Sequence, residues 1–408
     1  MQRRARVMLE RRRWLGLEVQ LDETKTRVRV ARVIEGSPAE RAGLRIGDVV
    51  ARIDDRPIAL PRDVVVRGEA RLVLDRAGER VEIVVSTEPL PIERIDGAAI
   101  ELGEIRGLRT IFARPERCDA GVLFLPGIDA SSVEHPLEPR HPLLAMIAGL
   151  ACAGFATMRF DRSGVGDSEG PPPSETGLDE ELDSARAALA ALASRVPRVF
   201  VLGHSLGGMI APLLGTRVAG IAVFGTSARR WRRCMIDTTE RQLALAGWSG
   251  EPRAERLAAW AEMHALVCRD GLTPGEAFAK HPELESLASR EVPRDGATMF
   301  GRHVSLFRAL EATDLAAAWR EVDAPVLAMH GEHDWVVSRD EGEEIATHAR
   351  GRFVALAGVG HDMRAHASLE SSFRRPQDGR LDGQLVDAFA SWARQTTAGP
   401  QASGNTQP

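Results

Sequence analysis

The segment that most constrains the fold is residues 198–214, which read RVFVLGHSLGGMIAPLL. An apolar run ends at Ser205, which lies between Gly203 and Gly207, and a helix-forming run follows at once. A strand that turns directly into a helix and exposes a side chain at the bend needs a strained backbone and small neighbours two positions away. The spacing therefore predicts a strand, a sharp turn and a helix, with the Ser205 hydroxyl presented at the turn.

A hydroxyl presented in this way needs partners before it can act as a nucleophile. A serine is weakly nucleophilic until a histidine takes its proton, and an acid must orient that histidine. Two apolar runs downstream supply both groups: APVLAMHGEHD ends in Asp334, and RFVALAGVGH ends in His361. Ligands of open α/β sheets bind at the carboxyl ends of the strands. The sequence therefore predicts Ser205 as nucleophile, His361 as base and Asp334 as the orienting acid.

Other titratable residues nearby fit these roles less well. We expect packing or local hydrogen bonds for the three histidines that flank the predicted site, namely His204, His330 and His333. The remaining rivals are placed off the strand ends, namely His366, Asp340 and Glu332. The turn FDRSGVGDSEG contains Asp161, Arg162 and Asp167, which we expect to hold their own loop by local charge pairs and Asx-type bonds.

Two sequence rhythms divide the chain. From Trp14 to Val85, short alternating runs separated by turn residues predict a small β-rich unit. The proline-containing stretch STEPLPIERIDGAA is typical of a linker. Beyond it, apolar strands alternate with helical stretches, which predicts an α/β fold with a mostly parallel, doubly wound sheet. The expected limits are 1–88 for the first domain, 89–98 for the linker, 99–396 for the second domain with a helical insert at about 229–315, and 397–408 for a disordered tail.

Charge and cysteine usage narrow the function classes. A formal charge of −5 over 408 residues argues against nucleic acid as a partner. The arginine-rich start, MQRRARVMLERRR, is expected to be a solvated arm, with contact to an acidic partner or membrane surface as the alternative. The absence of a signal-like core or an apolar run of membrane length predicts a cytoplasmic protein with no membrane span. The four cysteines lack C-x-x-C spacing, so we expect buried or partly buried free thiols, no metal and no cofactor.

Residues 100–395 resemble the α/β-hydrolase family, in the style of its serine aminopeptidase and esterase-like branch with an inserted helical cap. The resemblance rests on GHSLGG, HGEHDWVV and GVGHDM, and the stretches LFLPGID and FDRSGVGDSEG agree with it. It implies an oxyanion hole formed by the backbone N–H groups of Leu206 and Ile128. The chain departs from the family in placing Pro126 before Gly127, where a His-Gly pair is usual.

The N-terminal stretch is similar to a PDZ domain, on WLGLEVQL and VARVIEGSPAERAGLRIGDVVARIDDRPI. The resemblance implies that the loop Leu15, Gly16 and Leu17 offers N–H groups to the terminal carboxylate of a peptide that adds to the sheet edge. The segment LPRDVVVRGEA, which should form the second helix, is short and valine-rich and therefore a poor helix former. Two alternatives stay open: a domain that binds a C-terminal peptide, and one that only packs on the hydrolase.

Together these features predict a serine hydrolase that cleaves an ester, amide or thioester through an acyl-enzyme. Its substrate would be a small-molecule or peptide-like acyl compound. The insert segment RRWRRCMIDTTERQLALAGW is cationic and carries large aromatic side chains, and we expect a solvated arginine-rich helix there. Two other functions stay open, because a fold does not fix a reaction. They are a lyase or carbon–carbon hydrolase on the same scaffold, and a non-catalytic scaffold protein containing a PDZ domain.

Overall fold

The computed structural model describes residues 9–66, 68–215, 217–289 and 291–397. The described chain divides into two compact units, Glu10–Ile92 and the residues from Glu93 onward together with Leu9. The division falls inside the 89–98 segment that the sequence predicts to be a linker. The start of the predicted basic arm (1–8) and the predicted tail from 398 onward lie outside the described residues.

The smaller unit is an antiparallel sheet with a core of its own. Its strand order is β2-β3-β4-β6-β7, with bounds β2 (Leu17–Leu21), β3 (Val28–Val33), β4 (Val49–Ile53), β6 (Glu69–Arg76) and β7 (Glu79–Ser86). Alternate side chains such as Val30, Leu72 and Leu74 are buried, as the period of a half-buried strand requires. A short helix, α1 (Pro38–Arg41), begins where the Ser37 hydroxyl accepts a hydrogen bond from the Glu40 N–H.

Two features of this unit bear on the sequence predictions. The segment LPRDVVVRGEA contains a single 3-10 turn at Pro61–Asp63, which fits its poor helix propensity. The predicted solvated arm is wrong for Arg11 and Arg13, because the Arg11 Nε donates to the carbonyl of Leu90 at 2.9 Å and the Arg13 Nε donates to Thr87 Oγ1 at 2.9 Å. Between them, β1 (Arg13–Trp14) pairs with β8 (Glu88–Pro89).

The larger unit is built on one ten-stranded sheet, in the order β20-β19-β18-β17-β14-β13-β11-β12-β10-β9. Neighbouring strands from β12 to β18 are parallel, and β9, β10, β19 and β20 extend the sheet with antiparallel pairs. The bounds are β9 (Ala98–Ile105), β10 (Leu108–Pro115), β11 (Ala120–Leu125), β12 (Phe155–Phe160), β13 (Arg198–His204), β14 (Gly220–Phe224), β17 (Val326–His333), β18 (Arg352–Gly360), β19 (Arg364–Ala365) and β20 (Arg380–Leu381).

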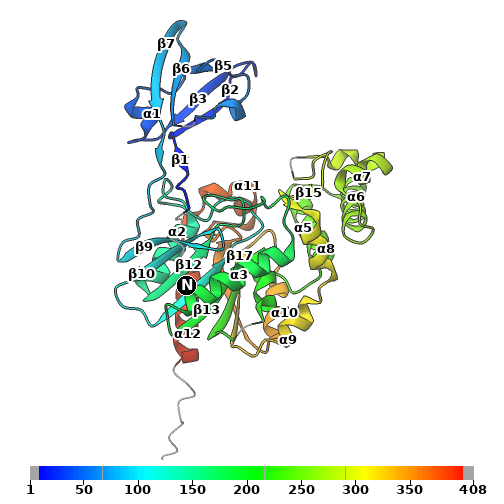
Figure 1. The fold of residues 1–408 in the computed structure, drawn as a ribbon. Helices are drawn as coiled ribbons and strands as arrows, with labels where there is room; N and C mark the ends of the chain where they lie inside the picture. Colours follow the sequence, from blue (N-terminus) through cyan, green and yellow to red (C-terminus); the bar gives the residue numbers. More distant parts are fainter. Residues whose placement is uncertain (1–8, 67, 216, 290, 398–408) are drawn as a thin grey trace, which may run out of the picture. The chain divides into compact units, whose positions relative to one another are not determined.

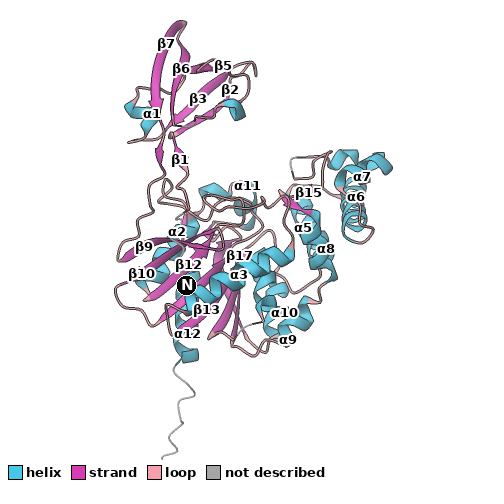
Figure 2. Ribbon diagram, viewed as in Figure 1, coloured by secondary structure: helices cyan, strands magenta, loops and turns pink. Residues whose placement is uncertain are grey.

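Helices cover both faces of this sheet, which explains why its central strands are buried on both sides (Figure 2). Helices α2 (Pro142–Cys152) and α12 (Gln384–Thr397) share one apolar cluster with the sheet, which includes Leu150 and Phe389. Helices α3 (Leu178–Ala193) and α10 (Arg339–His348) belong to the cluster that includes Leu189 and Ile345. The predicted α/β fold with a mostly parallel, doubly wound sheet is confirmed.

A helical insert separates β14 from β17 in the chain (Figure 1). It contains α5 (Trp231–Leu245), α6 (Gly250–Cys268), α7 (Pro274–Lys280), the two-residue strands β15 (Thr298–Met299) and β16 (Arg302–His303), then α8 (Val304–Ala312) and α9 (Leu315–Arg320). The prediction of solvated arginines fails at its first residues. Arg229 is ion-paired with Asp237, Asp340 and Glu344, and the last two lie on α10. The insert is therefore fastened to the sheet-covering layer by charge.

The cysteines and the helix lengths complete the fold. Cys234 and Cys268 are buried, and burial raises the pKa of the Cys268 thiol to about 12. Cys152 is exposed, so the expectation that all four thiols are at least partly buried is wrong at that position. Within the ranges that the structure describes, every helix is too short or too polar to cross a lipid bilayer.

Candidate active site

The three predicted catalytic residues occupy equivalent places on three strands. Ser205 directly follows β13, Asp334 directly follows β17, and His361 directly follows β18. These strands and β14 are consecutive in the sheet and parallel, so their carboxyl ends meet at one edge (Figure 1). The fold thus collects a hydroxyl, a carboxylate and an imidazole that are far apart in the sequence.

Ser205 sits on a strained turn between β13 and α4 (Leu206–Ile210). Its backbone has φ 51° and ψ −120°, a conformation that side-chain-bearing residues rarely adopt. A Cβ on Gly203 would lie 2.6 Å from the Gly207 carbonyl oxygen, and one on Gly207 would lie 2.1 Å from that of Leu125. Both glycines are therefore required by the backbone itself, which is the physical content of the G-x-S-x-G spacing.

Asp334 and His361 are joined by a hydrogen bond of 2.9 Å between Oδ2 and Nδ1. The other carboxylate oxygen of Asp334 accepts from the N–H groups of Val336 (2.8 Å) and Val337 (2.9 Å). Burial alone would raise the pKa of the Asp334 carboxyl, but the His361 imidazole and these hydrogen bonds outweigh it and lower that pKa. Asp334 is thus a buried, ionised acceptor that fixes the orientation of the His361 ring.

This hydrogen bond also selects the tautomer of His361. Because an ionised carboxylate can only accept, Nδ1 carries the hydrogen and the neutral ring keeps its lone pair on Nε2. Space for the pair comes from Gly225, which follows β14 with φ 58°. A Cβ there would lie 2.9 Å from Asp334 Oδ2 and 3.0 Å from His361 Nδ1. The sequence analysis missed Gly225, although its signal is visible as a glycine that ends the apolar run GIAVF.

Ser205 is tied to the same neighbourhood through β14 and His204. The Ser205 N–H donates to the carbonyl of Phe224, the residue before Gly225, at 3.0 Å. The His204 Nε2 lies 2.9 Å from the backbone carbonyl of His361, to which it donates, and its ring stacks on Phe224. Burial of the ring, with the neighbouring His361, lowers the pKa of His204 to about 3. His204 is therefore a packing and hydrogen-bonding residue, as predicted, and supports the backbone of His361.

The other rivals are engaged elsewhere. His333 Nδ1 lies 3.0 Å from the carbonyl of His366, and His366 Nε2 lies 3.0 Å from Asp362 Oδ1. Asp340 is paired with Arg229, and Glu332 accepts from the Gly358 N–H. Burial lowers the pKa of His330.

The two predicted oxyanion donors lie on either side of Ser205. Leu206 is the first residue of α4, so its N–H has no partner within the helix. Ile128 lies in the loop that follows β11, and we call residues 126–129 of this loop the β11 loop. A Cβ on Gly127 would lie 3.3 Å from the Cβ of Ser205, which places the β11 loop against the nucleophile.

The turn after β12 behaves differently from the prediction. Asp161 accepts from the Val133 N–H at 2.8 Å, and Arg162 donates to the Gly127 carbonyl at 2.7 Å. Asp167 forms a buried ion pair with Arg109 at 3.2 Å. These side chains therefore hold neighbouring segments, and the prediction that they serve their own loop by local bonds is wrong.

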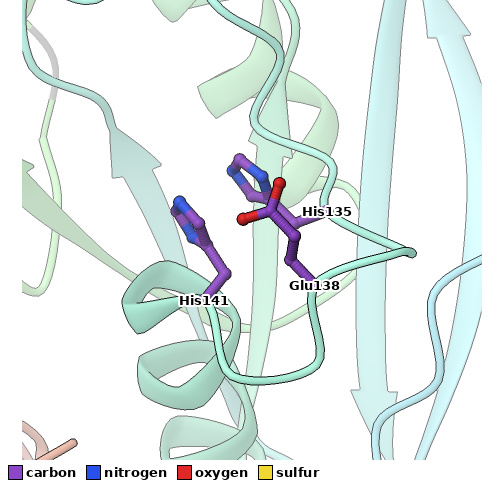
Figure 3. A group of neighbouring side chains, drawn as sticks. All are labelled: His135, Glu138 and His141. Carbon is purple, nitrogen blue, oxygen red and sulfur yellow. The ribbon is translucent and has the colours of Figure 1, made fainter. Parts of the chain in front are cut away.

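One group of side chains in the described part of the chain has metal-ligand types close together. His135, Glu138 and His141 offer ligand atoms within 4.8 Å of one another, in the loop that leads into α2 (Figure 3). The two imidazole rings are stacked, with centroids 3.4 Å apart and planes 11° apart. Nitrogen lone pairs lie in the ring planes, so nearly parallel rings direct them side by side and not toward one ion. The group includes none of the three predicted catalytic residues.

The predicted carboxylate loop of the smaller unit is held from within that unit. The Leu15 carbonyl accepts from the Ala39 N–H at 2.9 Å, and the Gly16 carbonyl accepts from the Ile34 N–H at 2.9 Å. Gly16 has φ 81°, and a Cβ there would lie 2.2 Å from the Ser37 Cβ. Leu17 begins β2, which is an edge strand of its sheet. The loop is thus fixed next to an open strand edge.

Comparison with known proteins places the larger unit in a family. Residues 122–371 match a model of the Alpha/beta hydrolase family, which is more than half of the chain. The chain belongs to the alpha/beta hydrolase family. In this alpha/beta hydrolase, residues 29–86 match a model of the PDZ domain, so the predicted combination of the two folds is confirmed.

Individual relatives of this alpha/beta hydrolase are distant. It is 22% identical over 279 residues to Esterase EstD of Thermotoga maritima, over 66% of this chain and 61% of the esterase. Similar solved structures include Est1E from Butyrivibrio proteoclasticus, at 16% identity and a TM-score of 0.43 over 74% of this chain and 100% of that one. Another is the proline iminopeptidase of Mycobacterium smegmatis, at 21% identity and a TM-score of 0.44 over 74% and 99%.

Proposed function

We propose that this alpha/beta hydrolase is a serine hydrolase that cleaves an ester, amide or thioester through an acyl-enzyme. Ser205 is the nucleophile, His361 the general base and Asp334 the acid that orients it. The observation that carries the proposal is the hydrogen bond between Asp334 and His361, at the strand edge that also presents Ser205 on a strained turn.

The first half of the reaction forms the acyl-enzyme. His361 Nε2 takes the proton of the Ser205 hydroxyl while Oγ attacks the carbonyl carbon of the substrate. The resulting imidazolium is stabilised by the buried carboxylate of Asp334. Negative charge develops on the substrate oxygen, and the N–H groups of Leu206 and Ile128 donate to it. His361 then returns the proton to the leaving alcohol, amine or thiol as the bond to carbon breaks.

The second half releases the acid. A water molecule gives a proton to His361 and attacks the acyl carbon, and the Ser205 oxygen leaves and takes that proton back. Every proton transfer runs through one nitrogen of one histidine. The fixed tautomer of His361 is therefore the condition on which both halves depend.

The bond that is cleaved is a finer question. The Thermotoga maritima relative is called an esterase, which favours an ester as the first substrate class to test. The match covers 61% of that protein, so its own activity is a guide to assays only. Small-molecule acyl esters and peptide-like acyl substrates both fit the proposed chemistry.

The proposal is tested by an activity screen of the full chain and of Ser205→Ala. Chromogenic acyl esters, aminoacyl amides and acyl thioesters are the three substrate classes, and a fluorophosphonate probe reports the nucleophile. We expect turnover in at least one class and one probe adduct per chain, both lost in Ser205→Ala. Turnover that persists in Ser205→Ala would point to other chemistry on this scaffold, and a wild type that neither turns over nor labels would point to a scaffold protein.

We further propose that residues 1–88 form a PDZ domain that binds a C-terminal peptide, that 99–396 form the hydrolase with a cap at about 229–315, and that 89–98 link them. The edge position of β2 and the fixed loop of Leu15, Gly16 and Leu17 support the peptide site. The short 3-10 turn at Pro61–Asp63 leaves one wall of such a groove reduced. Binding of this kind would raise the local concentration of a peptide-bearing substrate and add no chemistry.

A further inference from the structure

A buried cluster of three charged side chains lies beside the β11 loop. Arg162 donates through Nε to both carboxylate oxygens of Glu181, at 2.8 and 3.0 Å. Arg302 donates through Nη2 to Glu181 Oε1. Arg162 is 5% exposed, Arg302 is 0% exposed and Glu181 is 7% exposed. Groups of this kind are almost never buried without a purpose that offsets the cost of removing them from water.

The three residues come from three separate parts of the hydrolase. Arg162 follows β12, and Glu181 lies in the first turn of α3. Arg302 begins β16 in the insert, where Phe300 (φ 52°) and Gly301 (φ 71°) form a two-residue turn between β15 and β16. The tight turn fixes the direction of the Arg302 backbone. The cluster therefore joins the sheet, a covering helix and the cap.

The remaining donors of both arginines go to backbone carbonyls of the β11 loop. Arg162 donates to the carbonyls of Gly127 (2.7 Å), Asp129 (2.7 Å) and Pro126 (3.3 Å). Arg302 donates through Nη1 to the carbonyl of Ile128 at 3.4 Å. Four consecutive carbonyls of the loop, from residue 126 to residue 129, thus face one of two guanidinium groups.

The bond to Gly127 has a direct consequence for the proposed oxyanion hole. The carbonyl of Gly127 and the N–H of Ile128 belong to one planar peptide unit, in which the two groups point in opposite directions. Holding the carbonyl against Arg162 therefore fixes where the Ile128 N–H points. A charged donor on the carbonyl also polarises the peptide and strengthens its N–H as a donor. The contact from Arg302 fixes the next peptide unit, on the other side of Ile128.

The charge of the cluster favours the same outcome. Burial would raise the pKa of Glu181, but the charges of Arg162 and Arg302 and their hydrogen bonds lower it, so the carboxylate is ionised at neutral pH. Two guanidinium groups and one carboxylate then sum to one positive charge. A positive charge behind the β11 loop lowers the energy of negative charge in front of it.

We propose that Arg162 and Arg302, joined by Glu181, are positioning residues that aim and polarise the Ile128 N–H toward the oxyanion. The inference rests on the proposed serine-hydrolase function. Because Arg302 is supplied by the cap, the donor is fully aligned only when the cap is seated on the sheet. The cap thereby contributes to the chemical step and not only to substrate choice.

The test compares Arg302→Met, Arg302→Lys and a control, Arg109→Met, in the full chain with a chromogenic acyl ester. Arg109 is a suitable control because it forms a similarly buried pair with Asp167 and gives its other side-chain hydrogen bonds to Gly103 and Leu9. Four quantities are measured: kcat, KM, the inhibition constant of an alkyl boronic acid that forms a tetrahedral adduct on serine, and the pH profile of kcat.

For Arg302→Met we expect kcat to fall by about 10–100-fold, somewhat less than the loss of a whole oxyanion donor, with KM within about 2-fold. The boronic acid should weaken by a similar factor, because its adduct places an oxygen in the hole. The pH midpoint should not move, since His361 is untouched. Arg302→Lys keeps the charge with a single donor head and should fall between the two. Arg109→Met should keep kcat within about 3-fold of the wild type at a temperature where it is folded.

Three results would count against the inference. Equal kcat losses in Arg302→Met and Arg109→Met would show a general effect of a broken buried pair. A raised KM with unchanged kcat would show a role in substrate binding. If Arg302→Met does not yield folded protein, Arg302→Lys decides, and wild-type boronate affinity in that variant would overturn the proposal. Turnover that survives Ser205→Ala would instead overturn the proposed function itself, so the two failures are distinguishable.

Discussion

Single buried side chains set the protonation states on which this site depends. Asp334 stays ionised in the interior because His361 and two backbone N–H groups bind it. His204 stays neutral because its ring is buried and its Nε2 donates to a carbonyl. The same physical terms, burial against hydrogen bonding and charge, push a carboxylate and an imidazole toward the forms that the proposed mechanism needs.

Replacing Asp334 by Asn is expected to lower kcat by about 10²–10⁴-fold. The amide keeps the shape of the side chain but can donate to His361 Nδ1, which favours the wrong tautomer of the ring. The loss should be smaller than in Ser205→Ala, because the nucleophile and the oxyanion donors remain. Steady-state kinetics of both variants on one ester substrate provides the measurement. Equal, wild-type kcat in Asp334→Asn would mean that another group orients His361.

A second residue-scale prediction concerns acid stability. Burial, with a smaller effect of Arg232, lowers the pKa of His264 to about 4, and this residue is 0% exposed inside the cap. Because its folded pKa is below its unfolded value, the unfolded chain binds more protons between about pH 4 and 6.5, and stability falls as the pH falls through that window. From pH 7 to pH 5, His264 alone should account for a loss of about 2 kcal/mol in the free energy of unfolding.

The variant His264→Leu should therefore lose less stability than the wild type on acidification. Urea unfolding at pH 7 and pH 5, followed by circular dichroism, gives the two differences. Identical losses in the wild type and in His264→Leu would contradict the assignment of a depressed pKa to this histidine.

At the scale of elements, the turn between β13 and α4 is the most tightly specified part of the chain. A methyl group on Gly207 would meet the backbone of Leu125, which cannot rotate away. We expect Gly207→Ala to lower the free energy of unfolding by about 2–3 kcal/mol or more and to reduce kcat, since Ser205 must shift with the turn. The control is Gly383→Ala, where the nearest atom is an Asp387 carboxylate oxygen at 3.8 Å. Unchanged stability and kcat in Gly207→Ala would refute the strained turn.

The sequence carried the local elements well and the long-range contacts poorly. Ser205, Asp334 and His361 could be predicted because each follows an apolar strand directly, and strand ends of a parallel sheet gather at one edge. Gly225 and the contacts of Arg302 could not. The Arg302 hydrogen bond spans 174 positions to Ile128, and the turn that orients it carries Phe300 in a left-handed conformation that no common turn sequence signals. The hairpin of β9 and β10 was also missed, because its strands follow the prolines that marked a linker.

At the scale of the whole molecule, the chain combines a hydrolase with a PDZ domain, and their joint purpose is a prediction. A fluorescent peptide with a free, apolar C-terminal residue should bind the full chain, and the same peptide with a C-terminal amide should not, because the amide lacks the charge that the Leu15–Leu17 loop would hold. Fluorescence anisotropy of the pair measures this. Equal binding of acid and amide, or no binding of either across a set of apolar C-terminal residues, would favour a domain that only packs.

The central claim is that Ser205 is acylated during turnover. The most direct measurement is intact-mass and peptide mass spectrometry of the full chain after brief reaction with an acyl ester and acid quenching. The account predicts one acyl group per chain, on the peptide that contains Ser205, appearing at the rate of turnover and absent from Ser205→Ala. Turnover of the same ester with the acyl group on another residue, or with undiminished kcat in Ser205→Ala, would contradict it.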